Sequence, residues 1–367
     1  MSSWSPQQDA AIRDVQAWLK DPSAPQVFRL FGFAGTGKTT LARELAGDVR
    51  GKVLFGAFTG KAALVLRKKG CTNASTIHSM IYKLDEEDEQ RWQPKFILNP
   101  LSVVKGAKLV VIDECSMVGE ELARDLLSFG VKVLVLGDPA QLPPVKDAGF
   151  FTNHAPDVML TEVHRQAAEN PIIRMSMDIR QGKRLQHGQY GDSRVISADG
   201  LGRKAVLNAG IVLAGRNATR RELNAKIRAL HGYDSAHPLP GERLVCLRNN
   251  KDKKLLNGGL WGVHSVQKIK EVGVELLVTS DDTPETTPTE IYVRHEYFAG
   301  VEELLSWEQR KFTDEFTFGY CLTVHKSQGS QWDDVIVFDE SSTFREDAKR
   351  WLYTGVTRAA ERVTVVA

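Results

Sequence analysis

The chain has 367 residues, of which 42% are hydrophobic and 26% are charged, proportions typical of a soluble globular protein. Such a length exceeds one ordinary hydrophobic core, so we expect two or three compact units. The formal net charge of +2, from 48 basic and 46 acidic residues, permits a nucleic-acid partner without requiring one.

The four cysteines lie far apart and form no C-x-x-C pair, which argues against a zinc site or a disulfide framework. The N-terminal segment is polar, and no apolar run approaches the roughly 18 residues of a membrane span. We therefore expect a cytoplasmic protein with reduced thiols, no signal peptide and no membrane partner.

Short apolar runs alternate with amphipathic stretches along most of the chain. In the first half the expected segments are 27–31 (strand), 39–46 (helix), 53–58 (strand), 61–69 (helix), 109–112 (strand), 120–129 (helix) and 131–136 (strand). The pattern resumes with 158–160 (strand), a helix between Asn170-Pro171 and Gly182, 211–213 (strand), 219–230 (helix), and strands at 320–324, 335–338 and 363–366. Strand followed by helix, repeated, predicts parallel sheets covered on both faces.

Between residues 241 and 297 the helical periodicity disappears. Strand-like runs at 244–247, 262–269, 274–278 and 291–293 are separated by turn signals at Asn249-Asn250, 257–259 and Asp281-Asp282. This pattern predicts a small β-barrel inserted into the second α/β unit.

Residues 32–39, GFAGTGKT, fit the phosphate-binding pattern G-x-x-x-x-G-K-[ST] between a strand and a helix. Lys38 is expected to reach the β- and γ-phosphates of ATP, and the Thr39 hydroxyl to ligate Mg²⁺. The predicted ATP-binding residues of this loop are Gly35, Thr36, Gly37, Lys38, Thr39 and Thr40.

The apolar strand at 109–112 ends in Asp113 and Glu114. We expect Asp113 to hold Mg²⁺ through water, and Glu114 to orient and deprotonate the attacking water. The alternative is an acidic helix N-terminus, but together with the upstream loop the pair indicates a nucleotide triphosphatase.

Further segments show what the hydrolysis drives. The segments SPQQ at 5–8, DECSM at 113–117, LGDPAQLPPV at 136–145, LTVHKSQGS at 322–330 and YTGVTRA at 353–359 resemble superfamily 1 helicase motifs, in the same order. The residues of these motifs are similar to those of the RecD-like and Dda-like branch, and the resemblance runs from Gln8 to Arg358.

The resemblance implies roles for residues around ATP. Gln8 would contact the adenine, Gln141 would sense the γ-phosphate, and Gly329 would also contact the nucleotide. Arg165 and Arg358 would act as arginine fingers from the second unit, since a planar guanidinium suits charge on phosphoryl oxygens. For each arginine the alternative is an ordinary surface or helix-face residue.

The resemblance also implies contacts to the DNA backbone, made by small hydroxyls, amides and cations that do not read bases. The implied DNA-binding residues are Thr59, Lys61, Thr76, His78, Pro143, Thr323, His325 and Lys326. His78 and His325 have the alternative of structural caps. Arg248 and the lysines at 251–254 either line the strand's path or belong to a solvated basic loop.

Residues 82–100 interrupt the first unit where this branch carries a duplex-separating pin. Two short apolar runs flank an acidic segment at 85–89, and Trp92 or Phe96 would stack on the last base pair. The alternative is a surface loop without a role.

The sequence thus predicts an α/β fold with two RecA-like parallel-sheet P-loop domains. The first spans 1–158, with the hairpin insert at 82–100. The second spans 159–237 and 312–367, with an SH3-like β-barrel insert at 238–311. The expected function is a DNA helicase and translocase that moves 5′→3′ on single-stranded DNA and unwinds duplexes or forks, with Mg-ATP hydrolysed between the domains.

Such an enzyme is expected to be monomeric, to serve DNA replication, repair or recombination, and to work in the cytoplasm of a bacterial or phage-infected cell. Two alternatives stay open: a superfamily 1 RNA helicase, and a nucleic-acid-binding regulatory ATPase without unwinding activity.

Overall fold

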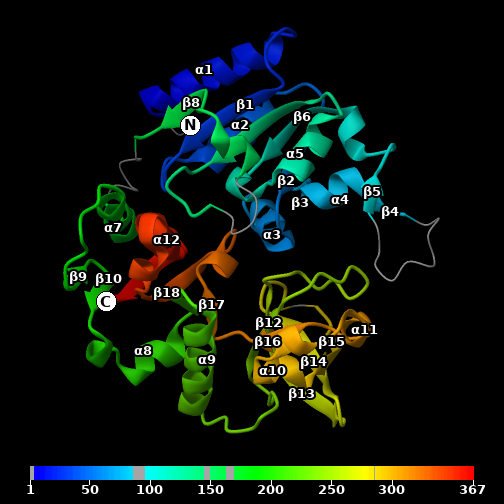
Figure 1. Cartoon of the computed structure of the whole chain (residues 1–367). Coiled ribbons are helices and arrows are strands. Elements are labelled where there is room, and N and C mark those ends of the chain that lie inside the picture. Colours follow the sequence, from blue (N-terminus) through cyan, green and yellow to red (C-terminus); the bar gives the residue numbers. More distant parts are fainter. Residues whose placement is uncertain (1–3, 86–95, 144–148, 163–168, 285) are drawn as a thin grey trace. The chain divides into compact units, whose positions relative to one another are not determined.

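The computed structural model describes residues 4–85, 96–143, 149–162, 169–284 and 286–367. The chain divides into two compact units, Met1–Ser176 (unit 1) and Met177–Ala367 (unit 2). Figure 1 colours them from blue to green and from green to red.

Unit 1 is built on a six-stranded sheet in the order β3-β2-β6-β7-β1-β8, and every pair in it is parallel. The strands are β1 (Val27–Gly32), β2 (Lys52–Ala57), β3 (Ala74–Thr76), β6 (Ala107–Ile112), β7 (Lys132–Gly137) and β8 (Val158–Leu160). The central strands β6 and β7 are nearly continuous apolar runs because both of their faces are covered. The predicted parallel α/β architecture is confirmed.

Helices cover both faces of this sheet. They are α1 (Pro6–Lys20), α2 (Lys38–Gly47), α3 (Gly60–Lys68), α4 (Ile77–Ile81) and α5 (Glu120–Leu127). Side chains of α1, α2 and α3 contribute to one buried cluster, and those of α4 and α5 to another. Helix α1 begins sharply, because Ser5 and Gln8 form a reciprocal capping box ahead of Pro6.

The predicted hairpin region contains two short strands, β4 (Tyr82–Leu84) and β5 (Phe96–Leu98), which pair antiparallel. Trp92 lies outside the described residues. Tyr82 faces Leu98 and Leu84 faces Phe96 in the register, so these four side chains share one face of the ribbon.

Unit 2 contains a six-stranded sheet in the order β17-β11-β18-β19-β10-β9, parallel except for its edge strand β9. The strands are β9 (Gly188–Tyr190), β10 (Ser193–Ile196), β11 (Ile211–Ala214), β17 (Cys321–Thr323), β18 (Trp332–Phe338) and β19 (Ala359–Val366). The accompanying helices are α7 (Pro171–Arg180), α8 (Arg203–Asn208), α9 (Asn217–His231) and α12 (Ala348–Val356). Asn170 caps α7, whose start at Asn170-Pro171 was expected, because its Oδ1 accepts from Ile172 N at 2.8 Å.

A second, antiparallel sheet interrupts unit 2, in the order β15-β14-β13-β12-β16. Its strands are β12 (Arg243–Cys246), β13 (Leu260–Ile269), β14 (Gly273–Ser280), β15 (Thr289–Arg294) and β16 (Phe316–Phe318). The short helices α10 (His295–Ala299) and α11 (Trp307–Lys311) lie between β15 and β16 in the chain. We call residues 243–318 the β insert.

Two boundaries differ from the expected ones. Strand β8, placed at the expected junction near residue 158, pairs with β1, so unit 1 continues to Ser176. Strand β16 lies beyond the expected end of the insert at 311, but it pairs with β12 and therefore belongs to the insert's sheet.

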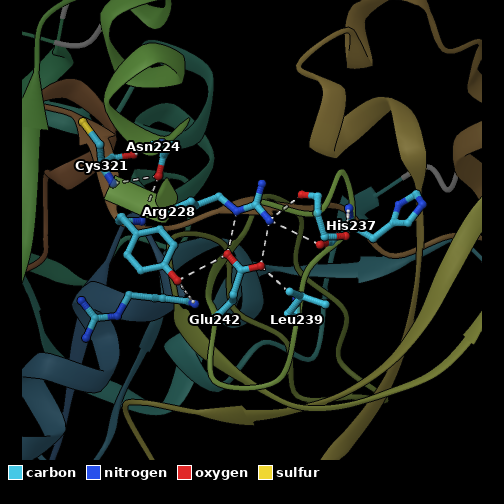
Figure 2. Close-up of polar contacts among 9 residues, drawn as sticks. Asn224, Arg228, His237, Leu239, Glu242 and Cys321 are labelled. Atoms are coloured by element: carbon cyan, nitrogen blue, oxygen red, sulfur yellow. Dashed lines mark hydrogen bonds and ion pairs between the residues drawn. The ribbon is translucent and has the colours of Figure 1, made fainter. Parts of the chain in front are cut away.

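A buried ion pair joins α9 to the segment that leads into the β insert (Figure 2). Arg228 donates to both carboxylate oxygens of Glu242, at 2.6 and 2.9 Å. Arg228 also donates to the carbonyl oxygens of Ser235 and His237 in the segment that enters the insert. One turn earlier, Asn224 binds the backbone where the chain leaves the insert, accepting from Tyr320 N and Cys321 N at 3.0 Å.

Candidate nucleotide-binding site and strand-contact residues

The loop between β1 and α2 has the open backbone that phosphate binding needs. Gly35 and Gly37 both adopt φ of 78°, a left-handed conformation that glycine enters without strain. A Cβ atom on Gly32 would lie 2.6 Å from Thr36 Oγ1 and 2.8 Å from Leu160 Cβ, so a larger residue would displace the loop. The backbone N–H groups at the start of α2 are thereby available to an anion.

Lys38 is folded over this loop. Its Nζ donates to the carbonyl oxygens of Gly32 at 2.6 Å and Phe33 at 2.9 Å. The ammonium therefore lies above the glycine-rich turn, where the predicted phosphate contact requires it.

The predicted magnesium ligands are brought together. Thr39 Oγ1 donates to Asp113 Oδ2 at 3.0 Å, joining the first turn of α2 to the end of β6. Burial, together with the adjacent charge of Glu114, raises the pKa of Asp113 above its usual value. A hydroxyl and one carboxylate are hard oxygen donors that suit Mg²⁺, an ion that keeps several waters and phosphate oxygens as its other ligands.

Glu114 has a strained backbone, with φ of 53° in the left-handed region. Its amide donates to Asp113 Oδ1 at 2.9 Å, so the two acids are held in a fixed mutual arrangement. Such strain at a non-glycine residue costs of order 1–3 kcal/mol and is characteristic of functional sites.

Gln8 is 2% exposed and touches the phosphate-binding loop directly. Its Nε2 donates to Thr36 O at 3.0 Å, while its Oε1 accepts from Ser5 N. The Nε2 end of the amide therefore joins α1 to the loop, the Oε1 end closes the cap of α1 itself, and the adenine contact stays a prediction. Sequence reasoning overlooked Gln7, whose amide binds the backbone of Met159, Thr161 and Glu162 after β8.

Gln141 lies just after β7 in unit 1. Its Oε1 is buried and has no hydrogen-bond partner among the described residues. An unsatisfied buried amide is unusual and fits a group that waits for a ligand. Pro143 is half-buried, Thr40 is exposed on α2, and residues 144–148 lie outside the description.

The predicted strand-contact residues of unit 1 sit at helix starts. Thr59 caps α3 by accepting from Ala62 N at 3.1 Å, and Thr76 caps α4 by accepting from Ser79 N at 3.1 Å. Lys61 is 5% exposed.

His78 is exposed. Its ring lies 4.6 Å from the rings of both Tyr82 and Phe96, centroid to centroid. The structure thus joins two predictions made separately, because a candidate DNA contact packs on a candidate pin residue.

In unit 2, Arg358 is 5% exposed. Its guanidinium donates to Thr354 O at 3.1 Å and to Ser330 O at 3.3 Å, beside Gly329. Gly329 adopts φ of 74°. Arg165 lies outside the described residues, so its predicted role has no structural counterpart here.

Thr323, His325 and Lys326 follow one another from β17 into a short 3-10 turn. Thr323 Oγ1 accepts from Lys326 N at 3.3 Å, and Lys326 Nζ donates to Asn257 Oδ1 of the β insert at 2.6 Å. Burial lowers the pKa of both His325 and Lys326. In the basic loop, Arg248 pairs with Glu315 and Lys253 with Asp314, so both side chains serve the insert's own structure.

The junction between β11 and α9 is closed by a carboxylate that sequence reasoning did not single out. Glu340 accepts from Gly215 N at 2.7 Å, from Arg216 N at 3.1 Å and from Thr219 Oγ1 at 2.7 Å. Burial alone raises the pKa of Glu340, but these hydrogen bonds outweigh it and hold the pKa below its ordinary value.

Two family models and several relatives match this chain. Residues 3–199 match the family described as an AAA domain, and residues 318–366 match the UvrD-like helicase C-terminal domain. The ATP-dependent RecD2 DNA helicase of Deinococcus radiodurans is 29% identical over 370 residues, covering 91% of this chain and 46% of that protein. The ATP-dependent DNA helicase Pif1 of Bdellovibrio bacteriovorus is 25% identical over 378 residues, covering 90% of this chain and 81% of that protein.

Solved structures share the fold. The crystal structure of Pif1 helicase from Bacteroides with ADP-AlF3 and single-stranded DNA has a TM-score of 0.57 and 17% sequence identity, covering 100% of this chain and 93% of that chain. The chain spans about half the length of the RecD2 relative, at 46%. None of the helices among the described residues is long and apolar enough to cross a membrane.

Proposed function

Because this chain belongs to the AAA-domain family, in its branch of RecD-like and Pif1-like superfamily 1 helicases, we propose that it is an ATP-dependent DNA helicase. It would translocate 5′→3′ along single-stranded DNA and unwind duplexes and forks. The main support for the ATPase part of this proposal is the hydrogen bond from Thr39 to Asp113, which follows directly on the glycine-rich loop.

Each candidate nucleotide-site residue of unit 1 has a role in the proposed reaction. Lys38 neutralises charge on the β- and γ-phosphates, and Glu114 orients the attacking water and takes its proton. Mg²⁺, held by Thr39 and Asp113, would neutralise phosphate charge as it develops. Gln141 presents its amide to the γ-phosphate, and Gln8 stays near the nucleotide through its bond to Thr36.

Arg358 supplies the positive charge that stabilises the transferring phosphoryl group. Arg165 would do the same. In the described conformation Arg358 donates to carbonyls of its own unit. These hydrogen bonds hold its guanidinium in one orientation, and a guanidinium has more N–H donors than they use, so it can also donate to phosphoryl oxygens. A contact that strengthens as charge develops on the phosphoryl group lowers the barrier to hydrolysis.

For the strand, we propose contacts from Thr59, Lys61, Thr76, His78 and Pro143 in unit 1 and from Thr323, His325 and Lys326 in unit 2. The antiparallel pair β4–β5 supports the pin assignment, with Phe96 and the undescribed Trp92 as stacking residues. The antiparallel five-stranded sheet supports an SH3-like assignment for the β insert. The protein is proposed to act as a monomer.

Strand displacement tests the function. Fluorescent duplexes with a 5′ or a 3′ single-stranded overhang are mixed with protein and Mg-ATP, and release of the labelled strand is followed. Unwinding of the 5′-tailed duplex supports the proposal, whereas unwinding of only the 3′-tailed duplex overturns the direction.

An ATPase assay with DNA or RNA oligonucleotides separates the alternatives. Stimulation by RNA alone would identify an RNA helicase. DNA-stimulated hydrolysis without strand displacement on any substrate would identify a regulatory ATPase.

A further inference from the structure

Two cations of unit 2 lie partly buried at the same end of the parallel sheet, and neither forms an ion pair with any residue that the structure describes. Arg220 belongs to α9 and Lys326 to the turn after β17. The Arg220 Nε atom is buried and has no hydrogen-bond partner among the described residues. Within the same residues, the Lys326 ammonium donates only to the neutral Asn257 Oδ1, at 2.6 Å.

Helix α9 directs Arg220 toward the end of β17, where Lys326 lies. Asn224 on α9 donates to Cys321 O and accepts from Cys321 N, so this turn of the helix is fixed at the start of β17. Arg220 lies four residues earlier and therefore on the same helix face, one turn closer to the helix N-terminus. A helix that connects parallel strands runs antiparallel to them, so this turn points toward the end of β17 and Lys326.

Electrostatics supports the same proximity. Burial is the main cause that lowers the pKa of Lys326, and the positive charge of Arg220 lowers it further, against raising contributions from Cys246 and from Glu315, whose carboxylate pairs with Arg248. Burial likewise lowers the pKa of Arg220, against a raising contribution from Glu302. Glu302 forms no ion pair with Arg220, and its own Oε2 is buried without a partner in the described part of the chain.

Unpaired cations in a partly dry site are costly, because their hydration is lost and not replaced. Such a pair persists when an anion completes it. The guanidinium offers its N–H donors in a planar fork, and Lys326 has two ammonium protons beyond the one given to Asn257. Thr323 and His325 of the proposed strand contact are close neighbours in sequence, so the anion is a group presented by that strand.

We propose that Arg220 and Lys326 form a phosphate-binding site for one backbone phosphodiester of the translocating strand, with Asn257 of the β insert as the residue that positions Lys326. This inference rests on the proposed function and adds Arg220 and Asn257 to its residues. It also gives the β insert a direct part in strand binding, since Asn257 is held by Asn249 Oδ1 and belongs to the insert's own turn.

The affinity for single-stranded DNA tests the site. Fluorescence anisotropy with a short oligothymidylate is recorded over a range of salt concentrations for the wild-type protein and for Arg220→Met. We expect roughly a tenfold loss of affinity, as for a lost charge-assisted bond. The slope of log affinity against log salt should fall by about 0.7, the value for one phosphate of a single strand.

Two further variants separate binding from folding. Arg220→Lys keeps the charge and loses the planar fork of N–H donors, so its affinity for DNA should lie between those of the wild-type protein and Arg220→Met. Glu302→Gln removes the carboxylate that competes for Arg220, so it should bind DNA several-fold more tightly. If Arg220 only serves Glu302 structurally, Glu302→Gln leaves the affinity unchanged or lowers it, and the proposal is wrong.

The matched control is Lys226→Met. Lys226 lies on the same helix and pairs with Glu222 at 65% side-chain exposure. We expect its DNA affinity and its DNA-free ATP hydrolysis to match those of the wild type. A loss equal to that of Arg220→Met would mean that the general charge of α9, and not a built site, matters.

Methylphosphonate substitution identifies the source of the phosphate. One neutral linkage is moved along the oligonucleotide, and we expect one position to weaken the wild-type protein but not Arg220→Met. Absence of such a position overturns the strand assignment. Binding of inorganic phosphate to the site as tightly as DNA binds overturns it as well. If the wild-type protein binds no nucleic acid at all, the proposed function itself has failed.

Discussion

Removing the carboxylate of Glu242 should destabilise unit 2 by about 3–5 kcal/mol, the usual cost of leaving one member of a buried ion pair alone. Glu242 is fully buried and Arg228 is 9% exposed, so solvent cannot replace the lost partner. The carboxylate also accepts from Leu239 N at 2.9 Å, a bond that Glu242→Ala deletes as well. Against a typical domain stability of about 5–15 kcal/mol, this loss is large.

The double variant Arg228→Met with Glu242→Met provides the sharper comparison. Replacing both charges by apolar side chains of similar size removes the uncompensated charge, so most of the stability should return. The Arg228 guanidinium already lies 3.8 Å from the Phe318 ring centroid, where a methionine side chain can pack. The double variant therefore should be clearly more stable than either single variant.

Urea denaturation followed by tryptophan fluorescence measures these differences, and hydrogen exchange shows whether α9 and β12 open first. Glu222→Ala is the control on the same helix, because its exposed pair with Lys226 should contribute less than about 1 kcal/mol. A Glu242→Ala midpoint equal to that of this control would refute the reasoning. So would a double variant that is no more stable than Glu242→Ala.

The remaining predictions test the proposed ATPase and helicase function. Lys38→Ala should abolish ATP turnover, and Glu114→Gln should bind nucleotide but hydrolyse it slowly; wild-type turnover in Glu114→Gln would place the base elsewhere. Arg358→Ala should lower kcat by about 10³–10⁵ with little change in KM, as for other arginine fingers, and a change confined to KM would exclude that role. Replacing residues 85–95 by a short Gly-Ser turn should lower duplex unwinding at least tenfold while preserving DNA-stimulated ATPase. Unwinding at the parental rate would reject the pin, and an equal loss of ATPase would show that the segment supports the fold.

The regular part of the fold follows from local patterns. Buried strands such as β6 and β7 are continuous apolar runs, and helices such as α7 begin at a clear cap, so their positions can be predicted from short windows. Strands β9 and β10 have no counterpart among the predicted elements, because they have only 3 and 4 residues and lack such a run. The boundary shifts at β8 and β16 depend on which distant strand each one pairs with, and short windows carry no such information.

The candidate sites divide in the same way. The phosphate-binding loop and the acids after β6 are contiguous motifs, so Lys38, Thr39 and Asp113 could be identified directly. Arg220 and Asn257 have no motif of their own. Asn257 lies 69 residues from its partner Lys326, and only the folded chain shows that this neutral side chain is the ammonium's acceptor.

The carboxylate of Glu340 has a consequence for nucleotide stoichiometry. Both units contain a parallel strand that turns into a helix, the geometry that favours anions at the helix start. In unit 1 this junction is a glycine-rich loop, whereas in unit 2 the amides of Gly215 and Arg216 already donate to an internal anion. A phosphate could enter the second junction only by displacing a carboxylate that is tethered to the chain and therefore present at high effective concentration. We accordingly expect one nucleotide per chain in calorimetric titration. The two halves have similar architectures but differ chemically, because the loop of unit 1 is open to a triphosphate and the junction of unit 2 is occupied by the protein's own carboxylate.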